Sequence, residues 1–147
     1  MLPTLNGRIQ TRIFLLVVVG GLWTLVISPI LPGLGRLELP EIYRMTFIVL
    51  LTTILLGVAW EFVYHFLQQF RWEKDWPTLF GLVTVVNEGA LVWVLLALGV
   101  VPGLPGGVPF GAFLLLFSTT WLLVWLAANG PMRVPFVHWR FRGGRLV

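Results

Sequence analysis

The ionisable side chains best placed for chemistry in this sequence lie on two apolar segments, where polar residues recur at helical spacing. On the first segment, polar and small residues stand four apart: Thr53, Gly57, Glu61, His65 and Gln69. Side chains four residues apart lie one above the next on a helix, which predicts a polar stripe along one face. A second segment carries a comparable side made of Gly81, Thr84, Asn87 and Glu88.

The two stripes are predicted to meet. If the segments form an antiparallel hairpin, Glu61 and Glu88 fall within about one helical turn of each other. Asn87 and His65 then lie beside them. A carboxylate in contact with lipid is costly, so we expect these four side chains to face the protein interior. Two close carboxylates in a low dielectric share a proton, so at least one is expected to stay protonated near neutral pH.

Three interpretations of this intramembrane polar cluster remain open. Buried polar groups in helix bundles often only hold the helices together. Glu61, His65 and Glu88 would alternatively form a proton-handling or ion-binding site, because ionisable residues at membrane depth mark function by default. A metal site is the weakest interpretation, since the cluster lacks the second histidine usual for zinc or iron. We therefore expect no metal and no cofactor.

The composition indicates what must position these residues. The chain has 147 residues, of which 58% are hydrophobic and 11% charged, whereas soluble domains carry about 25% charged residues. So much apolar surface requires lipid as its solvent. The chain contains no cysteine, which excludes disulfides and thiolate metal sites.

Four apolar segments, at about 13–31, 45–67, 79–101 and 110–128, are each long enough to cross a bilayer once. The links between them are short, which forces neighbouring helices to be antiparallel. We therefore expect an all-α membrane protein, a single domain over 1–147 built as an up-down bundle of four transmembrane helices. In the first segment, a row of small residues at Gly20, Thr24 and Ser28 is expected to allow close helix packing.

The distribution of Lys and Arg predicts the orientation. Eight of the ten basic residues flank one side of the spans, namely Arg8, Arg12, Arg71, Lys74, Arg133, Arg140, Arg142 and Arg145. Only Arg36 and Arg44 flank the other. The positive-inside rule then places both termini and the middle loop in the cytoplasm. We expect a bacterial plasma membrane protein whose first span is an uncleaved helix.

Two basic and aromatic stretches are expected at the membrane surface. In the middle loop, Arg71, Trp72 and Trp76 are expected to anchor at the headgroups. The tail, 129–147, alternates basic and aromatic residues as an extended chain would. Its Trp139, Arg140 and Arg142 are expected to contact anionic lipid headgroups. So short a stretch beside a membrane does not indicate nucleic-acid binding.

The sequence contains no phosphate-binding loop, no HExxH, no GxSxG and no paired-histidine haem motif. Three function classes therefore compete. The first is a structural or accessory subunit of a larger membrane assembly, with other membrane subunits or a second copy as partners. The second is a proton- or ion-linked transporter or channel that works as an oligomer. The third is a membrane-embedded enzyme, which lacks an identifiable nucleophile.

Overall fold

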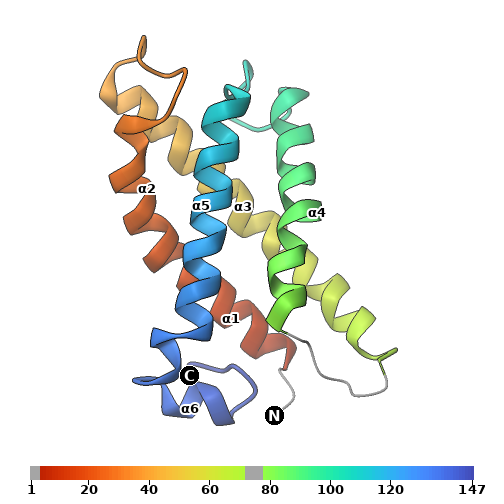
Figure 1. Cartoon of the computed structure of the whole chain (residues 1–147). Helices are drawn as coiled ribbons and strands as arrows, with labels where there is room; N and C mark the ends of the chain where they lie inside the picture. The colour runs from red at the N-terminus through yellow and green to blue at the C-terminus, as the bar shows by residue number, and fades with distance from the viewer. Residues whose placement is uncertain (1–3, 72–77) are drawn as a thin grey trace.

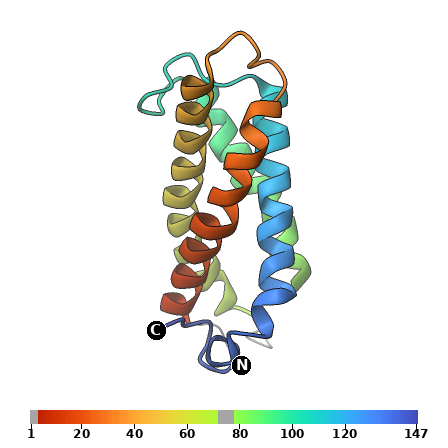
Figure 2. The ribbon, with the colours of Figure 1, turned by 90° about the vertical axis from the view of Figure 1, so that its left-hand side faces the viewer.

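A computed structural model describes residues 4–71 and 78–147 of the chain. Within these residues all regular secondary structure is helical, and four helices are long and apolar enough to span a membrane. They cover Leu5–Ile30, Leu39–Gln68, Thr78–Ala97 and Phe110–Arg133. Figures 1 and 2 show both chain ends at one end of the bundle, here called the lower end, and two of the connecting loops at the other, the upper end.

The first spanning helix is composite. It runs through α1 (Leu5–Leu15), the π-helical turn η1 (Leu16–Gly20), α2 (Gly21–Ile27) and the 3-10 turn η2 (Ser28–Ile30). It therefore begins well below the predicted start at residue 13, and its lowest turns bring Arg8 and Arg12 into the helix. Proline at position 29 ends the regular helix, because it cannot donate a backbone hydrogen bond.

The π-helical turn explains how one row of side chains stays inside along this whole span. The inward residues recur every four positions: Arg8, Arg12, Leu16, Gly20, Thr24 and Ser28. In a regular α-helix, four residues turn by about 400°, so such a row drifts by about 40° at each step. A π-turn takes an extra residue in each hydrogen-bonded loop, which counteracts the drift. The predicted small-residue row accordingly lies buried.

The remaining spans are α3 (Leu39–Gln68), α4 (Thr78–Ala97) and α5 (Phe110–Asn129). The helix α3 begins at Leu39, ahead of the apolar segment predicted to start at residue 45. Pro40 lies in its first turn, where a missing backbone N–H has no helical partner to lose. The helix α4 ends at Ala97, before the predicted end of its apolar segment at residue 101, and α5 covers the segment predicted at 110–128.

The upper end is closed by its own loops. Leu34, from the loop that precedes α3, and Leu104, from the loop that precedes α5, are both buried in the core. Gly99 begins the second of these loops at φ +68, and a Cβ there would lie 2.6 Å from the carbonyl oxygen of Pro105. Only glycine fits so close an approach in the left-handed region. These loops therefore seal the top of the bundle with apolar side chains.

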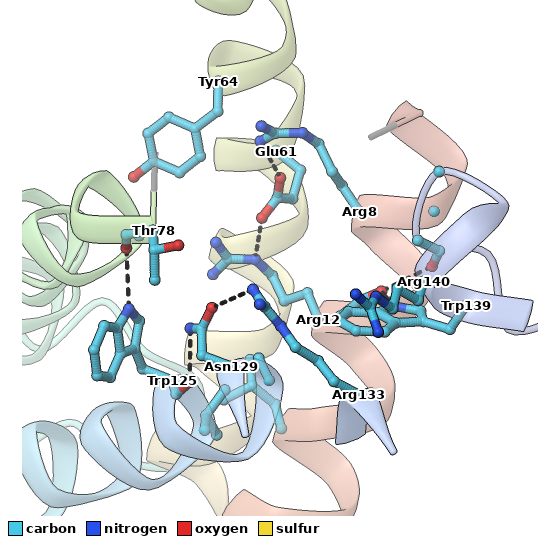
Figure 3. Close-up of a pocket in the computed structure, with 18 of the residues that line it drawn as sticks. Arg8, Arg12, Glu61, Tyr64, Thr78, Trp125, Asn129, Arg133, Trp139 and Arg140 are labelled. Carbon is cyan, nitrogen blue, oxygen red and sulfur yellow. Dashed lines mark hydrogen bonds and ion pairs between the residues drawn. The ribbon is translucent and has the colours of Figure 1, made fainter. Parts of the chain in front are cut away.

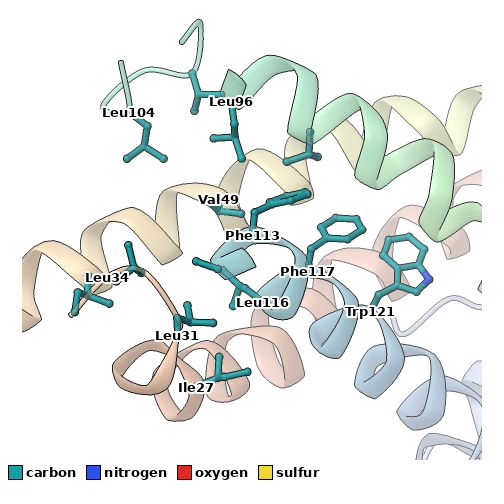
Figure 4. Packing of buried hydrophobic residues seen from close by; sticks show 14 residues of the cluster. Ile27, Leu31, Leu34, Val49, Leu96, Leu104, Phe113, Leu116, Phe117 and Trp121 are labelled. Atoms are coloured by element: carbon teal, nitrogen blue, oxygen red, sulfur yellow. The ribbon is translucent and has the colours of Figure 1, made fainter. Parts of the chain in front are cut away.

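Aromatic rings on α5 form the centre of the hydrophobic core (Figure 4). The ring centroids of Phe113 and Phe117 are 5.4 Å apart, and those of Phe117 and Trp121 are 5.7 Å apart. Trp93 of α4 packs on Phe113 at 5.4 Å. This row of stacked rings ends at Trp121, whose ring also contacts the charged side chain of Arg12.

The tail is the largest correction to the predicted structure. Instead of an extended chain, it forms η3 (Pro131–Arg133) and a short helix, α6 (Val137–Phe141). It then folds back on α1, where Gly143 accepts a hydrogen bond from the Thr4 backbone N–H at 2.9 Å. Gly7 lies so close to Gly143 that a Cβ would be 2.1 Å from its carbonyl oxygen. A glycine contact across the length of the chain therefore decides the tail conformation, and no local pattern could reveal it.

Candidate functional site

Four charged side chains form an ionic cluster in the lower half of the bundle. Arg12 Nε donates to Glu61 Oε1 at 2.6 Å. Its two terminal nitrogens donate to the two carboxylate oxygens of Glu88, at 2.7 and 3.0 Å. Arg8 Nη1 donates to Glu61 Oε2 at 3.2 Å. We call Arg8, Arg12, Glu61 and Glu88 the ionic cluster; Figure 3 shows its two arginine contacts to Glu61.

The four members come from three helices. Arg8 and Arg12 stand on α1, Glu61 on α3 and Glu88 on α4, so the cluster joins three helices. Side-chain exposure falls from 12% at Arg12 to 8% at Glu61 and 2% at Glu88. Charges buried this far are stable only when paired and hydrogen-bonded. The planar guanidinium of Arg12 meets that requirement by holding Glu88 with two parallel bonds.

Two uncharged side chains, Tyr64 and Asn87, extend the cluster by hydrogen bonds. Tyr64 donates its hydroxyl to Glu88 Oε1 at 2.9 Å, and Asn87 Nδ2 donates to the Tyr64 oxygen at 2.8 Å. The guanidinium of Arg12 also lies 5.5 Å from the ring centroid of Trp121, within the range of a cation–π contact. Glu88 therefore has partners from α1 and α3.

The structure brings Glu61, Glu88 and Asn87 into one network but leaves His65 outside it. Within the described residues, no hydrogen bond or ion pair links His65 to Glu61, and buried His65 Nδ1 has no hydrogen-bond partner. The cause is helix geometry: on a regular helix such as α3, residues four apart are rotated by about 40° about the helix axis at each step. The row leaves the interior after Glu61, and Tyr64, three residues on, takes the inward position.

The carboxylates that were expected to share a proton also have guanidinium partners. Arg12 lies between the two carboxylates and donates to both. With Arg8 included, two positive charges face two negative ones. The cluster is therefore electrically neutral as a set of ion pairs, and the third ionisable group expected there, His65, does not contribute.

Arg8 and Arg12 were not predicted as site residues, because their position before the first apolar segment placed them at the flank of the span. Basic residues at the end of a span usually mark its cytoplasmic side and extend toward the headgroups. Their spacing was a partial signal: both stand four residues apart in register with the small row at Gly20, Thr24 and Ser28, but such a row keeps to one face only with the π-helical turn. A row that stays in register places the two arginines inside.

Gly57 makes room for the central arginine. A Cβ at this position of α3 would lie 2.7 Å from Arg12 Nη1 and 2.9 Å from Arg12 Cδ. Both distances are shorter than a normal van der Waals contact. The absence of a side chain at Gly57 therefore lets the Arg12 side chain pass over α3 and reach Glu88. This explains why the predicted polar stripe contains a glycine at this position.

A cavity of about 640 Å³ opens below the ionic cluster at the lower end of the bundle. Arg12, Glu61 and Tyr64 form its inner wall. Trp121 and Trp125 line one side, and the folded tail contributes Trp139 and Arg140 (Figure 3). Its volume lies in the range of about 300–1,000 Å³ typical of small-molecule sites. The cluster is thus reachable from the lower end.

The predicted surface anchors have different surroundings. Trp139 is half-buried and donates to the Thr11 hydroxyl at 2.6 Å, whereas Arg140 and Arg142 are exposed. Arg71 lies 5.1 Å from the ring centroid of Phe80. Trp72 and Trp76 lie outside the described residues.

Hydroxyl groups continue the polar region above the ionic cluster. Thr24 Oγ1 and Thr120 Oγ1 are buried, with no hydrogen-bond partner within the described residues, beside a small void of about 10 Å³. Higher still, Ser28 Oγ donates to Thr46 Oγ1 at 2.8 Å. In the described part of the chain, no group of three or more His, Cys, Asp or Glu side chains is arranged to hold a metal ion.

Comparison with protein-family models, with curated protein sequences and with solved structures finds no match for this chain. Function must therefore be argued from the site itself.

Proposed function

We propose that this small multi-pass membrane protein acts as a structural or accessory subunit of a larger membrane assembly. The observation that carries the proposal is the pairing within the ionic cluster, where the two charges of Arg8 and Arg12 match those of Glu61 and Glu88. Such pairing stabilises one arrangement of three helices. An ion-linked mechanism instead needs a carboxylate that exchanges its partner during the cycle, whereas Arg12 holds both glutamates by hydrogen bonds.

We further propose that the lower end of the bundle faces the cytoplasm of a bacterial cell. The support is the excess of Lys and Arg on that side. Cysteine replacing Val147, which is 97% exposed, should resist a membrane-impermeant thiol reagent in intact cells. Cysteine replacing Gly35, where a Cβ meets no atom within 4 Å, should react. Labelling at Val147 and not at Gly35 would reverse the orientation.

The subunit proposal is tested by affinity purification of the tagged full-length chain in a mild detergent, followed by mass spectrometry. We expect a foreign membrane protein at a fixed ratio to the chain, absent from a four-span control protein that carries the same tag. Recovery of the chain alone, or only as a homo-oligomer, would contradict the proposal.

Two variants connect the assembly to the ionic cluster. Arg12→Gln leaves Glu88 without its charged partner and should reduce recovery of the foreign subunit. Arg12→Gln combined with Glu88→Gln removes one positive and one negative charge, leaving the pair of Arg8 and Glu61. This double variant should assemble better than the single one, because no uncompensated buried charge remains.

An ion-linked transporter is the second candidate, favoured by one observation. The cavity reaches Arg12 and Glu61 from the lower end, and the hydroxyls of Thr24 and Thr120 continue the polar region above them. In proteoliposomes with a pH-sensitive dye inside, this candidate predicts a proton flux that Glu61→Gln abolishes. A flux equal to that of empty liposomes would leave only the subunit proposal.

A further inference from the structure

The arginines that line the cavity fall into two classes. Arg8 and Arg12 are paired with glutamates on its inner wall. Arg133 and Arg140 lie nearer the lower surface and are exposed. Within residues 4–71 and 78–147, neither of these two forms an ion pair. Arg133 donates to the neutral Asn129 side chain at 3.1 Å, and Arg140 lies over the ring of Phe141. The inner wall therefore pairs its charges, while among the described residues the mouth carries two arginines without an ion pair.

The walls between mouth and cluster are mainly apolar and held in place. Trp121 Nε1 donates to the Gly81 carbonyl at 3.2 Å, and Trp125 Nε1 donates to the Thr78 carbonyl at 3.1 Å. These bonds occupy the polar edge of each indole and leave the ring for apolar contact. Val124 and Ala128, on the same face of α5, complete an apolar wall.

From this arrangement we propose that the cavity binds an amphiphile with an anionic phosphate headgroup. The phosphate lies between Arg133 and Arg140, where guanidinium groups can donate charge-assisted hydrogen bonds. The alkyl part lies along Trp121, Trp125 and Val124. The site goes beyond a structural role for the chain, because it assigns a ligand class to a cavity that the ionic cluster leaves open.

Charge and position favour a lipid over a soluble anion. The neutral inner wall gives an anion no reason to enter deeply, so the attraction is confined to the mouth. A small soluble phosphate would leave most of the volume of about 640 Å³ and its apolar wall in contact with water. A phospholipid satisfies both regions, and if the helices span the membrane its headgroup arrives at the level of the mouth.

The test uses the purified full-length chain in maltoside micelles and native mass spectrometry. The probes are dioleoyl phosphatidylglycerol, dioleoyl phosphatidylcholine and glycerol 3-phosphate. Phosphatidylglycerol should bind about tenfold or more tightly than phosphatidylcholine, since each basic residue near an anionic headgroup adds about a fivefold preference. Glycerol 3-phosphate should bind far more weakly than either lipid. Equal binding of the two lipids would refute the anionic site, and tight binding of glycerol 3-phosphate would show a soluble anion as the ligand.

Matched variants separate the cavity from the general charge of the surface. Arg133→Gln with Arg140→Gln should remove the preference for phosphatidylglycerol. Arg36→Gln with Arg44→Gln changes the same charge at the upper end, where both residues are exposed, and should leave the preference unchanged. An equal loss in both double variants would mean non-specific attraction and would overturn the proposal.

A third variant tests whether the ligand enters the cavity. Ala128→Phe places a ring in the cavity and should weaken binding of both lipids, with the thermal midpoint of unfolding as the check on folding. Gly81→Ala fills less of the cavity, because its Cβ would lie 3.7 Å from Trp125, an ordinary van der Waals contact. If folded Ala128→Phe protein binds both lipids as the wild type does, the ligand lies outside the cavity and the proposal is wrong.

Discussion

The upper and lower halves of the bundle use opposite means of holding the same helices together. The upper half is filled by apolar side chains, including Leu34 and Leu104 from the loops, with Ser28 and Thr46 as a buried polar pair. The lower half joins three helices by the ionic cluster and leaves a cavity beside it. Apolar packing therefore stabilises the upper half, whereas ion pairs stabilise the lower half and allow it to contain a cavity.

The largest effect is expected where the charge pairing is broken. Arg12→Gln leaves Glu88 without a charged partner and should lower the free energy of unfolding by about 3–5 kcal/mol. Adding Glu88→Gln should restore part of that loss, because the pair of Arg8 and Glu61 remains. Unfolding in mixed micelles of mild detergent and dodecyl sulfate measures both. A double variant no more stable than Arg12→Gln would show that the ion pairs do not hold the lower half.

In the upper half, the corresponding test removes part of a buried apolar side chain from the core. Leu96 is fully buried in the core, and Leu96→Ala should lower the free energy of unfolding by about 2 kcal/mol. This is the low end of the usual range, because separated helices still lie in lipid and only packing is lost. The same mixed-micelle unfolding measures it, with the exposed Leu98→Ala as the control. Equal losses at both positions would argue against a tightly packed upper half.

A smaller loss of stability is expected when the space beside the Arg12 side chain is filled. Gly57→Ala places a methyl group against the Arg12 side chain and should cost about 1–2 kcal/mol, as modest overpacking does. Gly21→Ala is the matched control on α2, because a Cβ there meets nothing within 4 Å and alanine favours a helix. Thermal midpoints in the same detergent compare the two. A tolerated Gly57→Ala would mean that Arg12 has room to move.

The sequence predicted the existence of the spans better than it predicted their ends. Hydropathy located four segments, since about 20 apolar residues are needed to cross a bilayer. It placed the start of the first span above Arg12 because charge was taken to mark the end of a helix. The structure instead pairs that charge internally. The earlier start of α3 has a similar origin, since Pro40 was counted as a helix breaker and lies in the first turn.

The candidate site was predicted in part. Depth and hairpin geometry placed Glu61 and Glu88 near each other, and both now bind Arg12. His65 was included because the four-residue row was treated as straight, although such a row drifts around a regular helix. The row on the first span stays straight because of a π-helical turn, which no residue pattern used here reveals. The cavity depends on the folded tail, a contact between Gly7 and Gly143 at opposite ends of the chain.

The smallest expected effect concerns the polar pair in the upper half. Ser28 Oγ donates to Thr46 Oγ1 at 2.8 Å, and both residues are buried between α3 and the first span. Ser28→Ala removes the Ser28 hydroxyl, whose single hydrogen is shared between Thr46 Oγ1 and the Thr24 carbonyl, but leaves Thr46 able to donate to the Ile42 carbonyl at 3.1 Å. No donor is stranded, so the loss should be about 0.5–1 kcal/mol, the net worth of one hydrogen bond. Unfolding in mixed micelles measures it against Ser118→Ala, an exposed serine on α5. A loss as large as that of Arg12→Gln would mean that polar contacts hold the upper half as well, and the contrast between the two halves would fail.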